Sequence, residues 1–275
     1  MNAHTYQKVL VIAGSDSGGG AGIQADIKTI SANGGYAETA ITALTAQNTL
    51  GVVDIFPIPV DFVSLQIQTV LSDIGADAVK IGMLYSAELI ETVAAELISF
   101  RTPHIVVDPV MVAQSGDSLL QDSAVTALVE KLLPLADIIT PNLLEAERLL
   151  NISIQGEKEM ERAAKMLAQL GSKSVLLKGG HFEKEPTSND VLYVKEDDTF
   201  HWYKAARCHT RNNHGTGCTL SSAIATHLAL GKSIPEAVWA AKEYITNAIT
   251  EGAQYTLGKG SGPVHHFYSF WGKST

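Results

Sequence analysis

Short apolar runs recur along the chain, and amphipathic stretches separate them. The first run, residues 8–13, lacks the polar alternation of a half-exposed strand, which predicts a strand buried on both faces. Further strands are expected at residues 39–44, 78–83, 104–109, 137–140 and 174–177, and helices at residues 87–100, 123–133, 142–150, 157–170 and 234–250. Strands separated by helices predict βαβ units and a parallel sheet with right-handed crossovers.

Two segments depart from this alternation. Residues 52–56 form an extended piece before two prolines, and residues 190–208 hold two apolar runs around an acidic turn. The second pattern predicts a β-hairpin. We find no internal repeat, linker or low-complexity tract, and 275 residues suit one large α/β domain. A single domain over residues 1–275 is therefore expected.

Composition narrows the classes of function. Hydrophobic residues make up 45% of the chain and charged residues 18%, which indicates a folded globular protein. The net charge of −9 disfavours nucleic acid and anionic membranes as partners, and no apolar run has the length of a transmembrane helix. Cys208 and Cys218 lack metal-ligand spacing, and no secretory signal precedes them. A cytoplasmic location is expected.

Residues 214–219, His-Gly-Thr-Gly-Cys-Thr, form the most informative motif. They precede the apolar run 220–230, which predicts a buried helix. The two glycines beside Thr216 allow positive φ and a close approach of the backbone to a ligand. Because the first amides of a helix have no partner within it and attract anions, the motif suits a phosphate. An ordinary loop-to-helix turn with Thr216 as N-cap fits the same residues.

Cys218 lies at the start of this predicted helix. The position is expected to lower the pKa of the thiol below its free value of roughly 8.5, which would make the sulfur a usable base. A buried and inert cysteine is the alternative interpretation.

Polar residues also follow three of the predicted strands. Asp108 ends one strand, Asn142 and Glu145 follow the next, and Lys178 follows a third. Because the carboxyl ends of parallel strands share one edge, these groups and the anion cradle would meet there, as phosphoryl transfer requires. Simpler explanations exist for each residue taken alone. Asn142 and Glu145 have the spacing of a capping box, Asp108 fits a plain turn, and Lys178 fits a solvated strand end.

A glycine-rich loop at residues 14–22 follows the first strand. Residues 20–25 fit G-x-G-x-x-A, but the strand ends too far from Gly20 for the tight turn of a dinucleotide site. No G-K-[ST] follows, which excludes a Walker loop. The poor loop geometry disfavours an NAD-dependent oxidoreductase.

Asp26 lies early in the helix that follows this loop, where an acid suits the helix dipole.

Taken together, the motifs resemble those of the hydroxymethylpyrimidine kinase and phosphomethylpyrimidine kinase family. The resemblance rests on AGSD at 13–16, GGAGIQAD at 19–26, TA at 42–43, AQNT at 46–49, KIGML at 80–84, DPVM at 108–111, TPNL at 140–143 with EA at 145–146, KGGH at 178–181, HGTGCT at 214–219 and GPVHHF at 262–267. These blocks span nearly the whole chain in the expected order, which makes the pattern specific.

The resemblance implies a ribokinase-like fold, a three-layer α/β/α domain with a mostly parallel central sheet and small β excursions. It implies an enzyme of thiamine biosynthesis that uses ATP and Mg²⁺. The expected substrate is a pyrimidine alcohol, 4-amino-5-hydroxymethyl-2-methylpyrimidine, whose monophosphate is phosphorylated in turn. Members of the family are usually homodimers.

The resemblance also assigns a substrate pocket. Gln47 would bind the pyrimidine, since one amide offers both a donor and an acceptor to a ring nitrogen and its neighbouring amine. The other residues expected in this pocket are Asp26, Gly14, Met83 and Val110.

The phosphoryl-transfer residues carry over in the same way. Cys218 would face the hydroxymethyl group, and the amides of Gly215, Thr216, Gly217 and Cys218 would form the anion hole. The metal and phosphate contacts expected are Asn142 and Glu145 for Mg²⁺, and Asp108, Lys178 and Thr216 for the phosphates.

The chain departs from the common family pattern at Ser17–Gly18, Gln114, Leu144 and Asn213. Loss of the lysine often found at position 114 would weaken a phosphate contact, and the Ser17–Gly18 loop would broaden the pocket. A pyridoxal-type vitamin kinase on the same fold is the nearest alternative function. A non-catalytic relative that binds the same ligand is another.

Overall fold

The computed structural model describes residues 4–111, 122–180 and 186–271. Within these ranges, one sheet has the strand order β3-β2-β1-β4-β5-β6-β7-β8-β9. The strands are β1 (Lys8–Asp16), β2 (Tyr36–Asn48), β3 (Gly51–Pro57), β4 (Ala78–Ile81), β5 (Ile105–Val107), β6 (Ile138–Ile139), β7 (Ser174–Lys178), β8 (Thr187–Val194) and β9 (Thr199–Ala206). Neighbours from β2 to β7 are parallel, whereas β3, β8 and β9 pair antiparallel.

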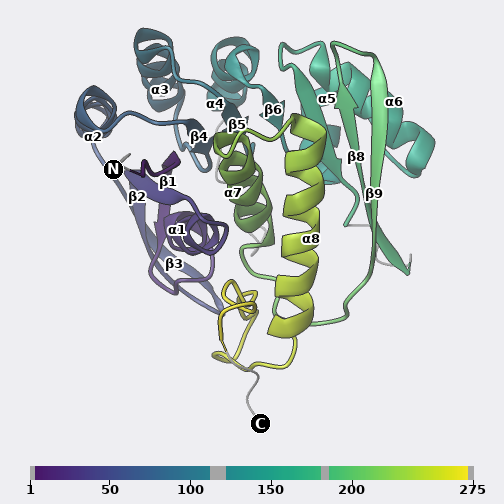
Figure 1. The fold of residues 1–275 in the computed structure, drawn as a ribbon. Coiled ribbons are helices and arrows are strands. Elements are labelled where there is room, and N and C mark those ends of the chain that lie inside the picture. The colour runs from purple at the N-terminus through teal and green to yellow at the C-terminus, as the bar shows by residue number, and fades with distance from the viewer. Residues whose placement is uncertain (1–3, 112–121, 181–185, 272–275) are drawn as a thin grey trace.

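Helices cover both faces of this sheet (Figure 1). They are α1 (Gly22–Ala32), α2 (Val60–Asp73), α3 (Ala87–Phe100), α4 (Asp122–Ala127), α5 (Leu143–Leu150), α6 (Glu157–Ala168), α7 (Thr216–Ala229) and α8 (Ile234–Gly252). Side chains of α1, α7 and α8 are buried against one face, and those of α2 to α6 against the other. The predicted three-layer, mostly parallel α/β/α fold is confirmed.

Strand β1 shows why the first apolar run lacks polar alternation. Leu10 and Ile12 belong to the core beneath α2 to α6, while Val9, Val11 and Ala13 belong to the core beneath α1, α7 and α8. None of the five exposes more than 1% of its surface. Both faces of the strand therefore select apolar side chains.

The predicted helix at 123–133 is only partly correct. Helix α4 ends at Ala127, and the chain continues as a π-helical turn over Leu128–Leu132 and a 3-10 turn over Leu133–Leu135. Pro134 lacks an amide proton and its ring excludes the regular helical path, which accounts for the change. The predicted hairpin is confirmed as β8 and β9, which pair in antiparallel register from Thr187–Ala206 to Val194–Thr199.

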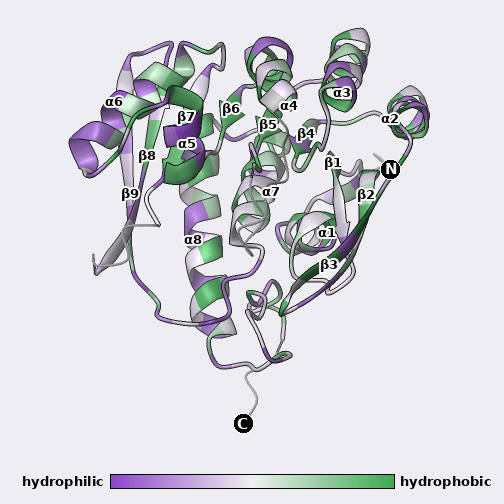
Figure 2. Cartoon of the chain, turned by 180° about the vertical axis from the view of Figure 1, so that it is seen from behind, coloured by the Kyte–Doolittle hydropathy of each residue, from purple (hydrophilic) through white to green (hydrophobic). Residues whose placement is uncertain are grey.

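The helices present mixed surfaces, with hydrophilic residues on the outside of α6 and hydrophobic residues where the layers meet (Figure 2). Among the described residues, none of the helices combines the length and the apolar character required to cross a membrane.

Candidate active site

Helix α7 begins at the carboxyl edge of the parallel strands, at the motif His214–Thr219. Its N-cap is Gly215, with φ of 79°, so the alternative with Thr216 as N-cap is wrong. A Cβ on Gly215 would lie 1.9 Å from the carbonyl oxygen of Gly20, so only glycine allows this turn to lie against the glycine-rich loop. The first helical bond runs from the Thr219 amide to the Gly215 carbonyl at 2.9 Å. Of the amides before it, that of Thr216 donates to the Asn213 carbonyl at 3.4 Å, and those of Gly217 and Cys218 have no acceptor within the helix.

An ion pair lies directly against this helix start. Lys178 Nζ is 2.9 Å from Asp108 Oδ1, which also accepts a 3.1 Å hydrogen bond from the Thr140 hydroxyl. A Cβ on Gly217 would lie 3.3 Å from Asp108 Oδ2 and 3.5 Å from Lys178 Nζ. The structure therefore brings together Asp108, Lys178 and the helix start, which the sequence predicted to meet at one sheet edge.

Both members of this pair are largely buried, which excludes the solvated strand end considered for Lys178. Burial alone would lower the pKa of Lys178, but the negative charges of Asp108 and Glu145 outweigh it and raise the pKa overall. The ammonium is thus held charged at the edge where α7 starts.

Asn142 and Glu145 form the capping box that the sequence left open as an alternative. Asn142 Oδ1 accepts the Glu145 amide at 2.9 Å, and Glu145 Oε2 accepts the Asn142 amide at 2.7 Å. Burial raises the pKa of Glu145 to about 7, although Lys178 and the amide of Met111 oppose the shift. The carboxylate therefore has a structural role at the start of α5 and still lies within the electrostatic reach of Lys178.

The described residues contain no group of three His, Cys, Asp or Glu side chains that could hold a metal unaided. Mg²⁺ in kinases is commonly held by one or two carboxylates together with substrate phosphates and water. Asp108 and Glu145 both interact with Lys178 and with each other electrostatically. This donor set fits Mg²⁺ that arrives with a nucleotide.

Cys218 differs from the expectation. Its sulfur accepts a hydrogen bond from the Gly22 amide, but burial raises the pKa of the thiol to about 11, and the nearby charge of Lys80 does not offset this. The charges of Asp26 and Asp108 raise the pKa further. The predicted lowering of the pKa is therefore wrong, because desolvation and two carboxylates outweigh the helix dipole.

Four of the five predicted pyrimidine residues lie on or just beyond neighbouring strands, whereas Asp26 lies in α1. A Cβ on Gly14 would lie 2.7 Å from the Met83 methyl carbon, so these two residues are in contact. Gln47 is half-buried near the end of β2, and Val110 is half-buried just beyond β5. Asp26 is fully buried, which places its carboxylate behind the surface of the other residues. Gln114, named above as a departure from the family pattern, and His181, the last residue of the KGGH motif, lie outside the described ranges.

Sequence reasoning missed the partner of Asp26. Lys80 Nζ is 2.9 Å from both carboxylate oxygens, and the Ser222 hydroxyl donates to one of them at 2.6 Å. Burial alone would lower the pKa of Lys80, but the charge of Asp26 raises it overall. The sequence did hold a sign of this pair: Lys80 lies within an apolar strand, and a fully buried charge requires a partner of opposite charge.

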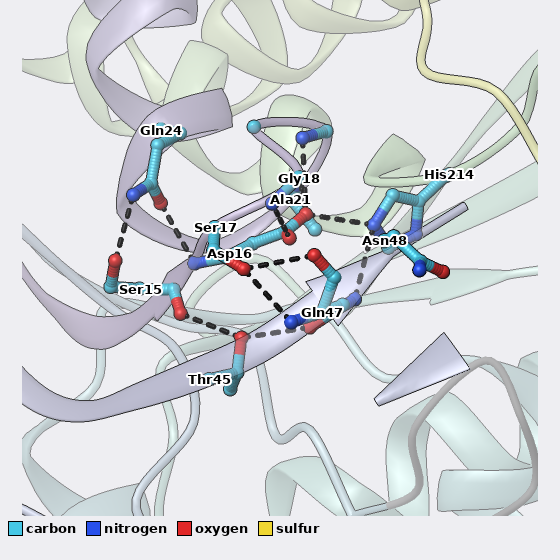
Figure 3. Close-up of polar contacts among 12 residues, drawn as sticks. Ser15, Asp16, Ser17, Gly18, Ala21, Gln24, Thr45, Gln47, Asn48 and His214 are labelled. Atoms are coloured by element: carbon cyan, nitrogen blue, oxygen red, sulfur yellow. Dashed lines mark hydrogen bonds and ion pairs between the residues drawn. The ribbon is translucent and has the colours of Figure 1, made fainter. Parts of the chain in front are cut away.

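A second missed feature is the pair formed by Asp16 and His214 (Figure 3). His214 Nε2 is 2.9 Å from Asp16 Oδ2 and 3.3 Å from Gln47 Nε2. The pair joins the glycine-rich loop, the end of β2 and the motif at the start of α7. Both residues were quoted within motifs, but nothing in their spacing indicated that they touch.

A separate cavity lies away from this edge. It has a volume of about 610 Å³ and lies between β9 and the first turns of α8, where Trp202, Tyr203 and Trp239 are among its lining residues. None of its lining residues belongs to the edge where α7 begins, so this cavity is separate from the site formed by Asp108, Lys178 and the helix start.

Fold and site together define a small-molecule kinase with a ribokinase-like fold. A family model described as phosphomethylpyrimidine kinase matches residues 16–265. The chain belongs to this family, as the sequence motifs predicted.

Individual relatives agree with this assignment. A hydroxymethylpyrimidine/phosphomethylpyrimidine kinase of Rhizobium meliloti is 51% identical over 263 residues, which cover 95% of this chain and 97% of the relative. A thiamine biosynthesis bifunctional protein of Geobacter sulfurreducens is 51% identical over 258 residues, 94% of this chain but 52% of the relative, so the chain spans about half of that protein.

The fold is also similar to that of a Bacillus subtilis pyridoxal kinase solved as an ADP complex. The TM-score is 0.88 and the sequences are 39% identical, with 95% of this chain and 98% of the other covered.

Proposed function

We propose that this protein is an ATP-dependent kinase that phosphorylates 4-amino-5-hydroxymethyl-2-methylpyrimidine and then its monophosphate. The observation that carries the proposal is the start of α7, where Gly217 lies against the Asp108–Lys178 ion pair. First-turn amides and a charged lysine are the groups that stabilise a transferring phosphoryl group.

The residues divide the reaction between them. The amides of Gly215, Thr216, Gly217 and Cys218 hold the terminal phosphate, and Lys178 neutralises charge on the nucleotide. The alcohol oxygen bonds to the γ-phosphorus while the bond from this phosphorus to the bridging oxygen of ADP breaks. The alcohol proton passes to the sulfur of Cys218, which accepts it as a thiolate.

The same edge supplies the metal donors. Glu145 and Asn142 would hold Mg²⁺ beside Asp108, and the ion would supply positive charge to offset that of the nucleotide phosphates. The raised pKa of Glu145, about 7, supports this role, since the buried carboxylate is short of positive charge.

Gln47 recognises the ring, and Gly14, Met83 and Val110 form the surface against which the ring lies. The contact between Gly14 and the methyl group of Met83 supports a closely fitted apolar wall. Asp26 supports this wall from behind through Lys80, which lies 3.0 Å from the position of a Cβ on Gly82.

Pyridoxal is the second candidate substrate. The similarity to a Bacillus subtilis pyridoxal kinase, with a TM-score of 0.88, favours it specifically. The greater identity to a hydroxymethylpyrimidine/phosphomethylpyrimidine kinase, 51% against 39%, favours the pyrimidine.

We also propose that the chain acts as a single domain, as a cytoplasmic homodimer. Apolar side chains on β3 and α2 support the dimer, since Val53 is 81% exposed, Phe56 64% and Phe62 54%. An exposed apolar patch of this kind marks an interaction surface.

An assay that couples ADP release to a colour change tests the function. We expect turnover with the pyrimidine alcohol and with its monophosphate, and much lower kcat/KM with pyridoxal. A preference for pyridoxal would replace the proposed substrate by the second candidate. Turnover of none of the three would leave a protein that only binds the ligand.

A further inference from the structure

Asp16 provides a carboxylate that can only accept hydrogen bonds. Its Oδ1 accepts the Gly18 amide at 2.8 Å, and Oδ2 accepts the amides of Gly20 at 3.0 Å and Ala21 at 2.9 Å. Burial alone would raise the pKa of Asp16, but the hydrogen bonds from His214 and these amides lower it overall. The carboxylate is therefore ionised.

This carboxylate decides where His214 carries a proton. Nε2 of His214 lies 2.9 Å from Asp16 Oδ2 and 3.3 Å from Gln47 Nε2. One ring nitrogen can donate or accept, but it cannot do both. Because Asp16 can only accept, Nε2 must hold a proton, and the shorter contact directs this proton mainly at Asp16. The NH₂ group of Gln47 then finds no acceptor on Nε2, whereas an amide oxygen in its place would share the same N–H as the longer branch of a bifurcated hydrogen bond.

The oxygen of the Gln47 amide also faces a partner that cannot satisfy it, because the Thr45 hydroxyl has no proton left to donate (Figure 3). The Thr45 hydroxyl lies 2.9 Å from the Ser15 carbonyl oxygen and 3.1 Å from Gln47 Oε1. A hydroxyl has one proton, and the shorter contact to Ser15 takes it. Thr45 then offers Gln47 only lone pairs, which suit an NH₂ group. A half-turn of the amide satisfies both ends at once.

We propose that Asp16 and His214 are positioning residues that lock the Gln47 amide with its oxygen toward His214 and its nitrogen toward Thr45. The proposal rests on the proposed function, in which Gln47 reads the substrate ring. The lock thereby fixes which side of the amide offers an acceptor to the substrate ring and which side offers a donor.

This order matters for an aminopyrimidine. The 4-amino group donates, and the adjacent ring nitrogen accepts, so the ring matches one orientation of the amide and opposes the other. The ring nitrogen of pyridoxal has no donor on a neighbouring atom, so pyridoxal gains much less from the same lock. The Asp16–His214 pair thereby favours the pyrimidine.

Nuclear magnetic resonance of the ¹⁵N-labelled imidazole tests the lock without any substrate. We expect Nε2 of His214 to be protonated in the wild-type protein, and the Asp16→Asn variant to lose this preference. An unprotonated Nε2 in the wild-type protein would overturn the proposal. This readout stays valid whatever the substrate is.

Steady-state kinetics test the consequence. We expect Asp16→Asn and His214→Phe to raise KM for the pyrimidine alcohol about tenfold, the loss of one well-placed hydrogen bond. KM for ATP should change by less than about twofold, since the phosphate side is untouched. His214→Gln should restore KM, because its NH₂ group can replace the Nε2 proton.

A double-mutant cycle separates positioning from general damage. In a Gln47→Ala background, neither Asp16→Asn nor His214→Phe should raise KM further. Lys28→Met serves as the control, since it removes the 2.8 Å bond from Lys28 Nζ to the Gly19 carbonyl and loosens the same loop without touching the pair. This control should leave KM unchanged.

The outcomes are distinct. Unchanged KM in both variants of an active enzyme, additive effects with Gln47→Ala, or an equal rise of KM for ATP would each overturn the lock. A wild-type protein that does not phosphorylate the pyrimidine would contradict the proposed function instead, and the imidazole spectrum would still decide the lock.

Discussion

Burial governs the ionisable residues of this site more strongly than their position on a helix. Cys218 lies in the first turn of α7, where the dipole favours a thiolate, yet burial raises the pKa of its thiol to about 11. Glu145 is raised to about 7 for the same reason. Both groups therefore hold a proton more readily than the same side chains would in water.

The raised pKa of Cys218 predicts a pH-dependent rate. If the thiolate accepts the alcohol proton, kcat/KM for the pyrimidine should rise with pH by up to about tenfold per unit between pH 7 and 9, because the thiolate fraction grows up to about pH 11. Cys218→Ala should lower kcat about 10²–10³-fold, with a much smaller effect on KM, and should flatten this profile.

Cys208 provides the matched control, since it is a second free cysteine and lies outside the start of α7. Cys208→Ala should keep both the rate and the pH profile of the wild-type enzyme. Full kcat in Cys218→Ala would exclude the sulfur as the base.

At the scale of elements, the contact between α7 and the glycine-rich loop holds the site together. Gly215 starts α7 in a left-handed conformation, and the space for its Cβ is taken by the Gly20 carbonyl oxygen. His214 joins the same loop through Asp16. The helix start and the loop are therefore one rigid unit, and damage to either should displace the other.

A pair of glycine substitutions tests this contact. Gly231 also has positive φ, 84°, but nothing lies within 4 Å of its missing Cβ. Gly231→Ala should lower the free energy of unfolding by about 1 kcal/mol, the cost of a left-handed alanine. Gly215→Ala should lower it by about 3 kcal/mol or more, because its Cβ also overlaps the loop.

Urea unfolding of both variants measures the difference, and the kinase assay follows its effect on the site. Equal losses of stability in the two variants would show that the loop yields easily and that the unit is not rigid.

The elements show what the sequence could predict. The limits of α3, Ala87–Phe100, agree with the predicted range, because its periodicity and its caps coincide. Strand β2 is longer than predicted, Tyr36–Asn48, because its half-exposed end carries polar residues that the apolar pattern does not mark. The break after α4 was missed, since Pro134 acts on a turn that otherwise looks helical.

The site was predictable where its residues follow strands directly. Asp108 and Lys178 were expected at one edge because parallel strands end together, and they form an ion pair there. Lys80 with Asp26 and His214 with Asp16 were not predicted. Their partners lie 54 and 198 positions apart, and no local pattern encodes which distant side chains touch.

At the scale of the whole molecule, one edge of the sheet carries exposed apolar side chains. Strand β3 forms one edge and carries hydrophobic residues along part of its length (Figure 2). Leu50, Val53 and Phe56 each expose more than 60% of their surface. Edge strands with exposed apolar side chains tend to associate, so this edge, together with Phe62 and Leu65 on α2, is where we expect the second copy to bind.

Charge substitutions on this edge test the homodimer. Val53→Asp combined with Phe56→Asp should convert the protein from a dimer to a monomer in analytical ultracentrifugation, because two buried carboxylates per subunit would oppose association. Trp239→Asp is the control, since Trp239 is 60% exposed on α8, away from β3. A dimer that survives the double substitution, or a wild-type monomer, would remove β3 from any interface.

The central claim is that the start of α7 holds the phosphoryl group while Cys218 faces the alcohol. A crystal structure with the pyrimidine alcohol and a non-hydrolysable ATP analogue tests it most directly. We predict the terminal phosphate within hydrogen-bond distance of the Gly217 and Cys218 amides, and the hydroxymethyl oxygen beside the sulfur of Cys218. A terminal phosphate bound elsewhere, or a sulfur that no substrate oxygen reaches, would contradict the account.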